Sequence, residues 1–372
     1  MGTIIDSWIK RYYARKKQQY KGSWQESYYS YLENYSIGEE WYSKRKAFCK
    51  RFLENNKYGV IRNRFMQHFY YHKFRFQMVF YGVRVKEFFT FGYYSKPLKA
   101  ASQAMTKTRI FWLDQYLNDP AQMKWVGDKA VFAEFIGDEL FGRKWIKGPV
   151  SFEDFLSTFE NCSRIIVKPL SKYGGRGIQS YTLDKGLETV YGEIIKKYDD
   201  EFIAEEYVNQ KGFMHDLNPS SLNTIRVITV RIPNTGNVHI MDSYARVGVP
   251  GTFVDNYSSG GVTYDLDLKT GTIGSGRNKT GGFNTVLKNH PGTNKSYSGL
   301  VIPHWNKILD TCKHAHTLIP AGLDFIGWDV CLSEDKVTFV EANTLPGFGR
   351  IYKEMSDTRW ATIEGLLNGD IS

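Results

Sequence analysis

The feature that most constrains this chain is a pair of short apolar runs near its C-terminal end. Residues 327–330 read Gly-Trp-Asp-Val, and residues 340–347 read Val-Glu-Ala-Asn-Thr-Leu-Pro-Gly. The polar turn Ser-Glu-Asp-Lys at 333–336 separates them. Two apolar runs on either side of such a turn predict a β-hairpin. Charged residues within apolar strands are costly to bury unless something pairs with them, so this hairpin indicates a site.

The hairpin should bring its polar side chains together. Because strand side chains alternate between faces, Glu341 and Asn343 share one face. A turn centred near residues 334–335 places Asp329 opposite Val340 or Glu341. Carboxylate and amide oxygens are the ligands that Mg²⁺ prefers, so Asp329, Glu341 and Asn343 are candidate metal ligands. The alternative is an ordinary strand face turned to solvent.

A second segment, far earlier in the chain, points to phosphate. Residues 164–169, Arg-Ile-Ile-Val-Lys-Pro, are typical of a buried strand ending in a lysine. A glycine-rich loop follows at 171–177, where the backbone can approach a phosphate closely and consecutive N–H groups can form an anion-binding nest. Lys168 would meet that phosphate as a point charge. The loop is not a P-loop, because no Gly-Lys-Ser/Thr follows, and a plain hairpin turn is the alternative. The candidate loop glycines are Gly174, Gly175 and Gly177.

Together these segments resemble the ATP-grasp family, from about Leu113 to Met355. Asp128-Lys129 resembles the lysine motif that precedes the central domain. Residues 167–177 resemble the lid that clamps the nucleotide, and residues 204–208, Ala-Glu-Glu-Tyr-Val, resemble the hinge strand whose backbone reads adenine. The resemblance implies an α+β fold in which two subdomains clamp ATP.

Two further runs resemble a narrower group, the sugar-transfer-associated ATP-grasp proteins. They are residues 218–226, Asn-Pro-Ser-Ser-Leu-Asn-Thr-Ile-Arg, and residues 255–261, Asp-Asn-Tyr-Ser-Ser-Gly-Gly. Proteins of that group are associated with bacterial polysaccharide biosynthesis. The resemblance implies an ATP- and Mg²⁺-dependent ligase that activates a carboxylate as an acyl-phosphate and passes it to an amine.

The resemblance also implies roles for single residues. Asp329, Glu341 and Asn343 would hold two Mg²⁺ ions, and Lys129 and Lys168 would contact the phosphates. An acidic residue usually holds the ribose after the hinge, but residues 209–212, Asn-Gln-Lys-Gly, contain none. The nucleotide-binding set is completed by Glu205, Glu206, Val208 and, as the nearest substitute for the ribose ligand, Asp216.

Arg226 is the candidate catalytic cation. Strand alternation places it with Ile228 and Val230 on an apolar side, where an arginine requires an anionic partner. The γ-phosphate and the acyl-phosphate are the expected partners, and the guanidinium fork suits both. The alternative is a structural ion pair with Asp329 or Glu341. Candidate substrate contacts, for which a purely structural role is as good an interpretation, are Asn223, Asp255, Asn256, Ser259, Gly260 and His290.

Charge divides the chain unevenly. Residues 1–110 carry 22 Lys/Arg and 7 Asp/Glu, a net charge of +15, which leaves −5 for the remainder of a chain of net +10. Aromatic residues are interleaved with these charges, as in residues 69–76. This mixture suits an anionic partner such as a membrane face or a pyrophosphate-linked glycan carrier. The sequence contains no motif for nucleic-acid binding, and an ordinary helical domain is the alternative.

The chain is expected to comprise three parts. Residues 1–110 form a basic, aromatic-rich helical region, residues 111–208 the first ATP-grasp part with its lid, and residues 209–372 the catalytic part. Helices are expected at 128–142 and, begun by Ser151, at 151–160. The Gly-, Asn- and Ser-rich region 250–300 is expected to form loops across the active site. Strands are expected at 164–170, 201–208, 224–232, 238–247, 322–332 and 337–343.

The four cysteines are widely spaced and form no metal motif, which favours a reducing cytosol. The sequence has no apolar run of about 18 residues, and its first 21 residues are too polar for a signal peptide. We therefore expect a cytoplasmic protein, peripheral at the inner membrane face. Its expected substrates are a small carboxylate and an amine, such as an amino acid and a sugar. A kinase with the same nucleotide site, or a non-catalytic module that binds anionic surfaces, are the alternatives.

Overall fold

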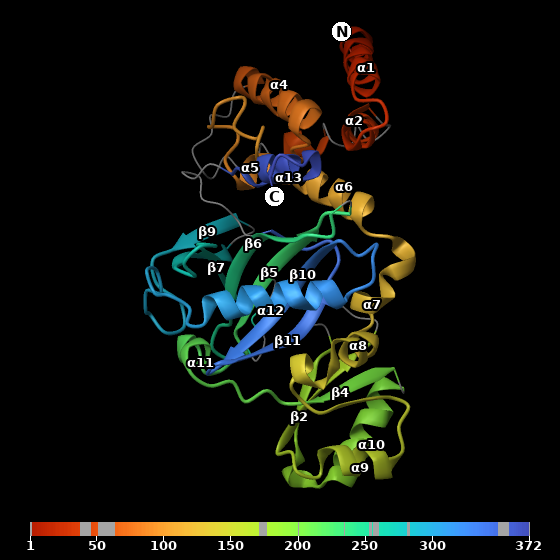
Figure 1. Cartoon of the computed structure of the whole chain (residues 1–372). Coiled ribbons are helices and arrows are strands. Elements are labelled where there is room, and N and C mark those ends of the chain that lie inside the picture. Colours follow the sequence, from red (N-terminus) through yellow and green to blue (C-terminus); the bar gives the residue numbers. More distant parts are fainter. Residues whose placement is uncertain are drawn as a thin grey trace. The chain divides into compact units, whose positions relative to one another are not determined.

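The computed structural model describes most of the chain. The described residues are 2–37, 46–50, 64–170, 177–199, 201–233, 235–252, 255, 260–280, 283–348 and 357–371. The chain divides into two compact units (Figure 1). Residues 117–349 form the sheet unit, and residues 1–116 together with 350–372 form the helical unit.

The sheet unit is built on a seven-stranded antiparallel sheet with the strand order β11-β10-β5-β6-β7-β8-β9. Helix α12 (Trp305–Leu318) lies across one face of this sheet (Figure 1). Ile308 of α12 joins Val227 and Trp328 of the sheet in one apolar core. The strands are β5 (Thr224–Arg231), β6 (Val238–Val247), β7 (Val262–Leu266), β8 (Ile273–Thr280), β9 (Phe283–Leu287), β10 (Phe325–Ser333) and β11 (Lys336–Asn343).

A second, four-stranded antiparallel sheet has the order β1-β4-β2-β3. Its strands are β1 (Trp145–Lys147), β2 (Arg164–Pro169), β3 (Gln179–Thr182) and β4 (Phe202–Glu206). Helices α9 (Phe152–Phe159) and α10 (Leu187–Tyr198) pack on it through a core that includes Phe155, Val167 and Ile194. The Oγ of Ser151 accepts the amide N–H of Asp154 at 3.1 Å, which satisfies a donor at the start of α9.

Three more helices complete the sheet unit: α7 (Lys124–Gly127), α8 (Lys129–Phe141) and α11 (Phe213–Leu217). Helix α8 begins after Asp128, whose carboxylate accepts the amide N–H of Ala130 at 2.8 Å. This cap places Lys129 in the first turn of α8. Helix α8 packs beside β11, the strand that carries Glu341 and Asn343.

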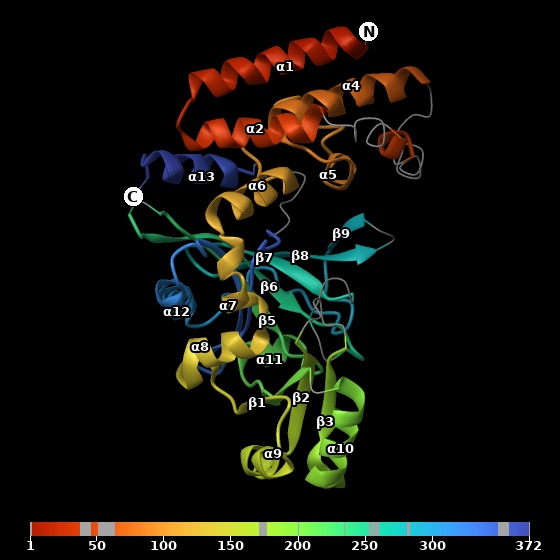
Figure 2. The same ribbon diagram turned by 90° about the vertical axis from the view of Figure 1, so that its right-hand side faces the viewer.

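The helical unit contains α1 (Gly2–Gln19), α2 (Trp24–Ile37), α4 (Arg64–Tyr81), α5 (Val85–Thr90), α6 (Lys107–Leu117) and α13 (Arg359–Asn368). Figure 2 shows the N-terminal helices with α13 beside them. The rings of Tyr28, Trp112 and Trp360 pack together with centroids 4.8–5.8 Å apart. The C-terminal helix α13 therefore belongs to the aromatic core of this unit. The division expected from the sequence, at residues 110 and 208, placed it in the catalytic part instead.

Two general properties concern the whole described chain. Within the described residues, none of the helices combines the length and apolar character needed to cross a bilayer. The four cysteines, Cys49, Cys162, Cys312 and Cys331, are free thiols.

The structure confirms the six expected strands, the two expected helices and the helical character of the described N-terminal residues. The expectation of loops throughout residues 250–300 is wrong, because β7, β8 and β9 lie there. The glycines that suggested a loop have a packing role instead. A Cβ on Gly276 of β8 would lie 2.5 Å from the ring of Tyr264 on β7. The close approach of that ring therefore requires glycine within a regular strand.

Candidate functional site

The polar side chains of the C-terminal hairpin belong to a row that crosses the large sheet. Strand pairing sets Asp329 opposite Glu341, Arg226 opposite Asp329 and Tyr244 opposite Arg226. Paired residues project from the same face, so these four side chains share the face that α12 does not cover. The expected hairpin is confirmed, with Asp329 opposite Glu341 rather than Val340.

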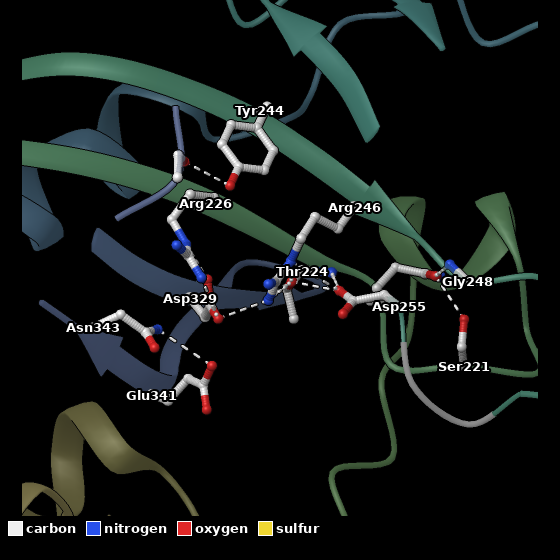
Figure 3. A network of polar contacts seen from close by, with 12 residues as sticks. Ser221, Thr224, Arg226, Tyr244, Arg246, Gly248, Asp255, Asp329, Glu341 and Asn343 are labelled. Atoms are coloured by element: carbon white, nitrogen blue, oxygen red, sulfur yellow. Dashed lines mark hydrogen bonds and ion pairs between the residues drawn. The ribbon is translucent and has the colours of Figure 1, made fainter. Parts of the chain in front are cut away.

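Asp329 is the centre of this row and is fully buried. It accepts hydrogen bonds from Nε and Nη2 of Arg226, the latter at 2.9 Å, and forms an ion pair with Nη2 of Arg246 at 2.7 Å (Figure 3). Burial opposes its charge, but the two arginines outweigh burial and hold the pKa of Asp329 well below its usual range. The structure thus shows the ion pair that was the alternative for Arg226, and its γ-phosphate contact stays a prediction.

Arg246 connects Asp329 to a second buried carboxylate, Asp255. Its Nε and Nη2 lie 2.9 and 2.8 Å from Oγ1 of Thr224, and its Nε lies 3.6 Å from Oδ2 of Asp255. Asp255 also accepts the amide N–H and the hydroxyl of Thr224 at 2.9 and 2.5 Å. Burial raises the pKa of Asp255, and Arg246 opposes that rise. Asp255 therefore lies within the charged network and lines the cleft described below.

Glu341 differs from the other carboxylates of the network. Among the described residues it takes part in no ion pair, and its Oε1 accepts the side-chain amide of Asn343 at 3.2 Å. Burial raises the pKa of Glu341, and the neighbouring negative charge of Asp329 raises it further. Arg246 and Arg226 oppose this rise, but Glu341 remains the carboxylate of the row that has no ion-pair partner among the described residues.

A Mg²⁺ ion fits this donor set. Asp329 accepts two hydrogen bonds from Arg226 and forms an ion pair with Arg246, whereas Glu341 keeps most of its acceptor positions. A cation held by Glu341, the amide oxygen of Asn343 and Asp329 would relieve the charge that burial disfavours. In the described part of the chain, His, Cys, Asp and Glu form no cluster of three or more suited to a metal. Mg²⁺ is commonly held by one or two carboxylates together with substrate phosphates, and this site would be of that kind.

Glu205 belongs to a separate buried ion cluster on the small sheet. Its Oε2 lies 2.7 Å from Nε of Arg143, and its Oε1 lies 2.7 Å from Nζ of Lys168. Burial opposes the charge of Glu205, but these two cations hold its pKa below the ordinary value. In this structure both carboxylate oxygens of Glu205 are engaged, by Arg143 and by Lys168, and its part in nucleotide binding stays a prediction. Glu206 and Val208 do line the cleft, and hinge-backbone recognition of adenine stays a prediction.

The two predicted phosphate lysines lie close to the same place. Nζ of Lys129 lies 3.3 Å from the carbonyl oxygens of both Pro169 and Leu170, at the end of the strand that carries Lys168. Burial lowers the pKa of Lys129, and Glu341, Glu205 and Lys168 all contribute to its field. A smaller cavity lined by Lys129, Glu341 and Asn343 connects these groups.

An open cleft of about 800 Å³, which includes solvent-filled space, brings these groups together. One part of its wall is apolar and comes from Ile166, Ile178, Val208, Leu222 and Val340. The other part is charged and comes from Lys168, Arg143, Glu205, Arg246, Asp255, Asp329 and Glu341. Ligand sites commonly combine an apolar wall with a few polar groups. The apolar part of the wall suits a purine. The charged part, in which Glu341 has no ion pair among the described residues, suits phosphates with a metal ion.

Three predicted residues lie elsewhere. Asn223 is fully buried, and its side chain is engaged by Ser221, Met214, Asn218 and Gly248, so it is not a substrate contact here. His290 is buried too. Its Nε2 lies 2.9 Å from the carbonyl oxygen of Gly248, and its Nδ1 accepts backbone N–H groups, so it positions a loop rather than a substrate. Asp216 is exposed on α11 and is not part of the cleft wall, which leaves the ribose ligand unassigned.

The remaining predicted residues belong to loops. Gly177 has φ +78°, a left-handed conformation that favours glycine, and its carbonyl oxygen accepts the hydroxyl of Tyr198 at 2.9 Å. Ile178, the next residue, lines the cleft. Gly260 has φ +94° and is partly exposed. Outside the described residues lie Gly174, Gly175, Asn256 and Ser259.

Arg143 and Arg246 are functional candidates that sequence reasoning missed. Arg246 lies in a correctly expected strand and is paired with Thr224 of β5, so the signal was an arginine within an apolar strand, the same signal that identified Arg226. Arg143 follows Gly142, which ends α8 in a left-handed conformation. A single arginine after a helix has no distinctive pattern, and only the three-residue strand β1 beside β4 explains its approach to Glu205.

Comparison with known proteins identifies the family. A family model described as sugar-transfer associated ATP-grasp matches residues 112–357. No curated protein matches the chain.

Several solved structures resemble part of it. An L-amino acid ligase from Bacillus licheniformis has 12% identity and a TM-score of 0.40, with 70% of this chain and 53% of that chain covered. A biotin carboxylase from Campylobacter jejuni has 13% identity and a TM-score of 0.42, covering 71% and 52%. A D-alanine–D-alanine ligase from Coxiella burnetii has 11% identity and a TM-score of 0.38, covering 72% and 64%. This chain therefore spans between half and two thirds of their lengths, and the family assignment rests on the family model.

Proposed function

The chain belongs to the sugar-transfer-associated ATP-grasp family and has the α+β ATP-grasp fold, and from this premise we propose that it is an ATP- and Mg²⁺-dependent carboxylate–amine ligase. We propose further that it acts in the cytoplasm and adds an amide-linked group to a bacterial surface polysaccharide or to a precursor of one. The description of the family, which links it to sugar transfer, supports that class of substrate.

One observation carries the proposal of ATP-dependent chemistry. Glu341 and Asp329 line the same cleft as Lys168, and Glu341 takes part in no ion pair among the described residues. A purely structural ion network would be expected to neutralise each buried charge. A carboxylate that has no ion pair, beside two arginines, fits a site in which a bound Mg²⁺ ion and its phosphates would supply the missing contacts.

The residues of the cleft then have separate tasks. Glu341, Asn343 and Asp329 would hold Mg²⁺, which when bound supplies a Lewis acid for the phosphoryl oxygens. Lys168 and Lys129 would neutralise phosphate oxygens. Arg226 and Arg246 are held in place by Asp329, so their unused N–H groups are oriented before the substrate arrives, at no cost in reorganisation.

The proposed reaction has two steps. An oxygen of the substrate carboxylate attacks the γ-phosphorus of ATP, and the bond from that phosphorus to the β–γ bridging oxygen breaks. ADP departs, and the carboxylate now carries the phosphoryl group as an acyl-phosphate. An amine then attacks the acyl carbon, loses its proton and expels phosphate, which leaves an amide. The substrates are a small carboxylate and an amine, in our proposal an amino acid and an amino sugar or sugar acid. The acyl-phosphate is the activated species, so no cysteine or serine nucleophile is required.

The proposal is tested with the full chain, ATP, Mg²⁺, amino acids and nucleotide- or lipid-linked sugars, followed by mass spectrometry of the products. Hydroxylamine is added in a parallel reaction, because it converts an acyl-phosphate into a hydroxamate. We expect an amide product, a hydroxamate in the trap, and ADP and phosphate in equal amounts. Glu341→Gln serves as the inactive control.

A kinase would give ADP and a phosphorylated product, and it would release no free phosphate whether or not an amine is added. That result would overturn the ligase proposal while leaving the nucleotide site in place. A lack of ATP turnover with every substrate pair would favour a non-catalytic module.

A further inference from the structure

Helix α4 of the helical unit carries a continuous aromatic stripe. Phe65, Phe69, Phe76 and Phe80 recur at multiples of helical spacing and share one face, with His72 between them. The stripe has two halves with different surroundings. Phe80 packs against Tyr12 and Trp8 of α1, with ring centroids 4.9 and 6.3 Å apart. Phe65 and Phe69, at the other end of α4, are 76% and 54% exposed.

Helix α1 continues this surface with another exposed aromatic residue and with positive charge. Trp8 is 52% exposed although it touches Phe80. Arg11 and Arg15 follow Trp8 at helical spacing on the same face and are exposed, and Lys10 beside them is exposed as well. We define the aromatic–basic face as Phe65 and Phe69 at one end of the α4 stripe, together with Trp8, Arg11 and Arg15 of α1, which meets the stripe at its other end through Phe80.

Negative charge is scarce on these two helices. Asp6 is the one acidic residue in the sequence of α1, and it forms an ion pair with Arg75 of α4 at 2.5 Å. The sequence of α4 contains neither Asp nor Glu. This ion pair ties the two helices together, and the positive charge of Arg11 and Arg15 remains on the surface.

We propose that the aromatic–basic face binds the headgroup region of an anionic lipid bilayer. Large aromatic side chains that stand more than half exposed on the outer side of helices gain most from a fluid boundary between water and acyl chains, and tryptophan prefers that boundary. The exposed arginines that follow Trp8 on α1 can pair with lipid phosphates through their planar fork. The sequence offers no motif for nucleic acid, and the net charge of +15 over residues 1–110 complements an anionic surface.

The attraction has an electrostatic part and an apolar part, which can be separated. Each basic side chain near an anionic bilayer contributes about fivefold in partition, and this part weakens as the Debye length falls from about 10 Å at 0.1 M salt to about 3 Å at 1 M. The contribution of Phe65 and Phe69 depends on removal of apolar surface from water, so it persists in high salt.

The test is co-sedimentation of the full chain with vesicles of phosphatidylcholine, with and without one third phosphatidylglycerol, across that salt range. We expect binding to the anionic vesicles alone. Arg11→Glu/Arg15→Glu should lower the partition coefficient at low salt at least tenfold, since two charges are reversed. Phe65→Ser/Phe69→Ser should lower it at both low and high salt. Circular dichroism of each variant verifies that the fold is retained.

Two matched controls make the outcome specific. Lys185→Glu/Lys196→Glu introduces the same charge change at exposed positions of the sheet unit, and Leu98→Ser removes a different apolar side chain, 41% exposed, from the helical unit. Both should bind within about twofold of the parent chain, as substitutions outside the face should. Equal losses in the controls, equal binding to neutral vesicles, or salt-sensitive binding to single-stranded DNA without binding to vesicles would each overturn the proposal.

Discussion

The two units of this protein place several of their arginines in opposite surroundings. In the sheet unit, Arg143 and Arg226 are buried and each contacts a carboxylate. In the helical unit, Arg11 and Arg15 are exposed, and the buried Arg109 is held by carbonyl oxygens and aromatic rings. The first pattern creates a fixed field inside a cleft, and the second leaves charge on a surface.

The difference has a consequence for mutation. A buried ion pair is costly to break on one side only, because the remaining charge stays buried without compensation. An exposed charge can be changed with little effect on stability. Substitutions in the sheet unit should therefore combine losses of activity and stability, whereas surface substitutions in the helical unit should change binding alone. Four experiments test this comparison.

The largest effect is expected from Glu341→Gln. Glu341 is the carboxylate in the row without an ion pair in the described structure, so its loss should leave the arginine network intact while removing a proposed Mg²⁺ ligand. We expect ATP turnover to fall about a thousandfold or more, which corresponds to about 4 kcal/mol of transition-state stabilisation. Glu334→Gln, in the exposed turn of the same hairpin, is the matched control and should keep full turnover. More than about a tenth of the parent rate in Glu341→Gln would contradict the metal assignment.

The next effect is expected from Asp329→Ala, and here it concerns stability. This change removes the partner of both Arg226 and Arg246 inside a fully buried site. We expect the free energy of unfolding to fall by about 3–5 kcal/mol in urea denaturation. Glu33→Ala in the helical unit is the comparison, because its partner Lys17, at 2.6 Å, is partly exposed. That change should cost less than about 1 kcal/mol. Equal costs for the two variants would remove the distinction between the units.

Much of the site could be predicted because its information is local. A turn of known length and strand alternation suffice to place Asp329 opposite Glu341, and a lysine before a glycine-rich loop suffices to single out Lys168. The partners of these residues depend on strand order instead. Arg226 and Asp329 are about 100 residues apart in sequence and meet only because β10 pairs with β5. No local pattern specifies that pairing.

The same reason explains what was missed. Arg246 enters the site because β6 lies on the other side of β5, and Glu205 meets Arg143 and Lys168 because β4 lies between β1 and β2. In the region 250–300, glycine was interpreted as a loop signal, although at Gly276 it is required by a neighbouring ring. The assignment of α13 to the helical unit likewise depends on long-range contacts, such as the amide N–H of Trp360 on the carbonyl oxygen of Gln103 at 2.9 Å.

A smaller effect is expected from Arg109→Met in the helical unit. The guanidinium donates to the carbonyl oxygens of Ala101 and Ala104 at 3.0 and 2.6 Å and lies 4.6 Å from the ring centroid of Trp360. Methionine keeps much of the packing but leaves the carbonyl oxygens without their donor. We expect a loss of about 2 kcal/mol in the free energy of unfolding. Arg11→Met, on the exposed face of α1, should change it by less than about 0.5 kcal/mol. A difference below that limit for Arg109→Met would show that this buried cation is dispensable.

The smallest effect is a difference in pH dependence between the units. In the sheet unit, the cations around Glu205 and Asp329 hold the pKa of each below its ordinary value, so their contribution to stability is lost as pH falls through those lowered values. In the helical unit, burial raises the pKa of Glu87 to about 6, although its carboxylate accepts the amide N–H groups of Arg84 and Lys107 at 2.9 and 2.7 Å.

The sign for Glu87 is therefore reversed. Its folded state binds a proton more tightly than the unfolded state, so its contribution is fully present below the unfolded pKa of about 4.3 and is lost as pH rises through about 6. Glu87→Gln cannot titrate and is the matched control. The unfolding free energies of the parent chain and of Glu87→Gln are measured in urea from about pH 5 to about pH 7.5. The parent chain, relative to Glu87→Gln, should be about 1 kcal/mol more stable at about pH 5 than at about pH 7.5. A difference that stays constant with pH, or that shifts the other way, would mean that water reaches this carboxylate and that burial in the helical unit does not control its charge.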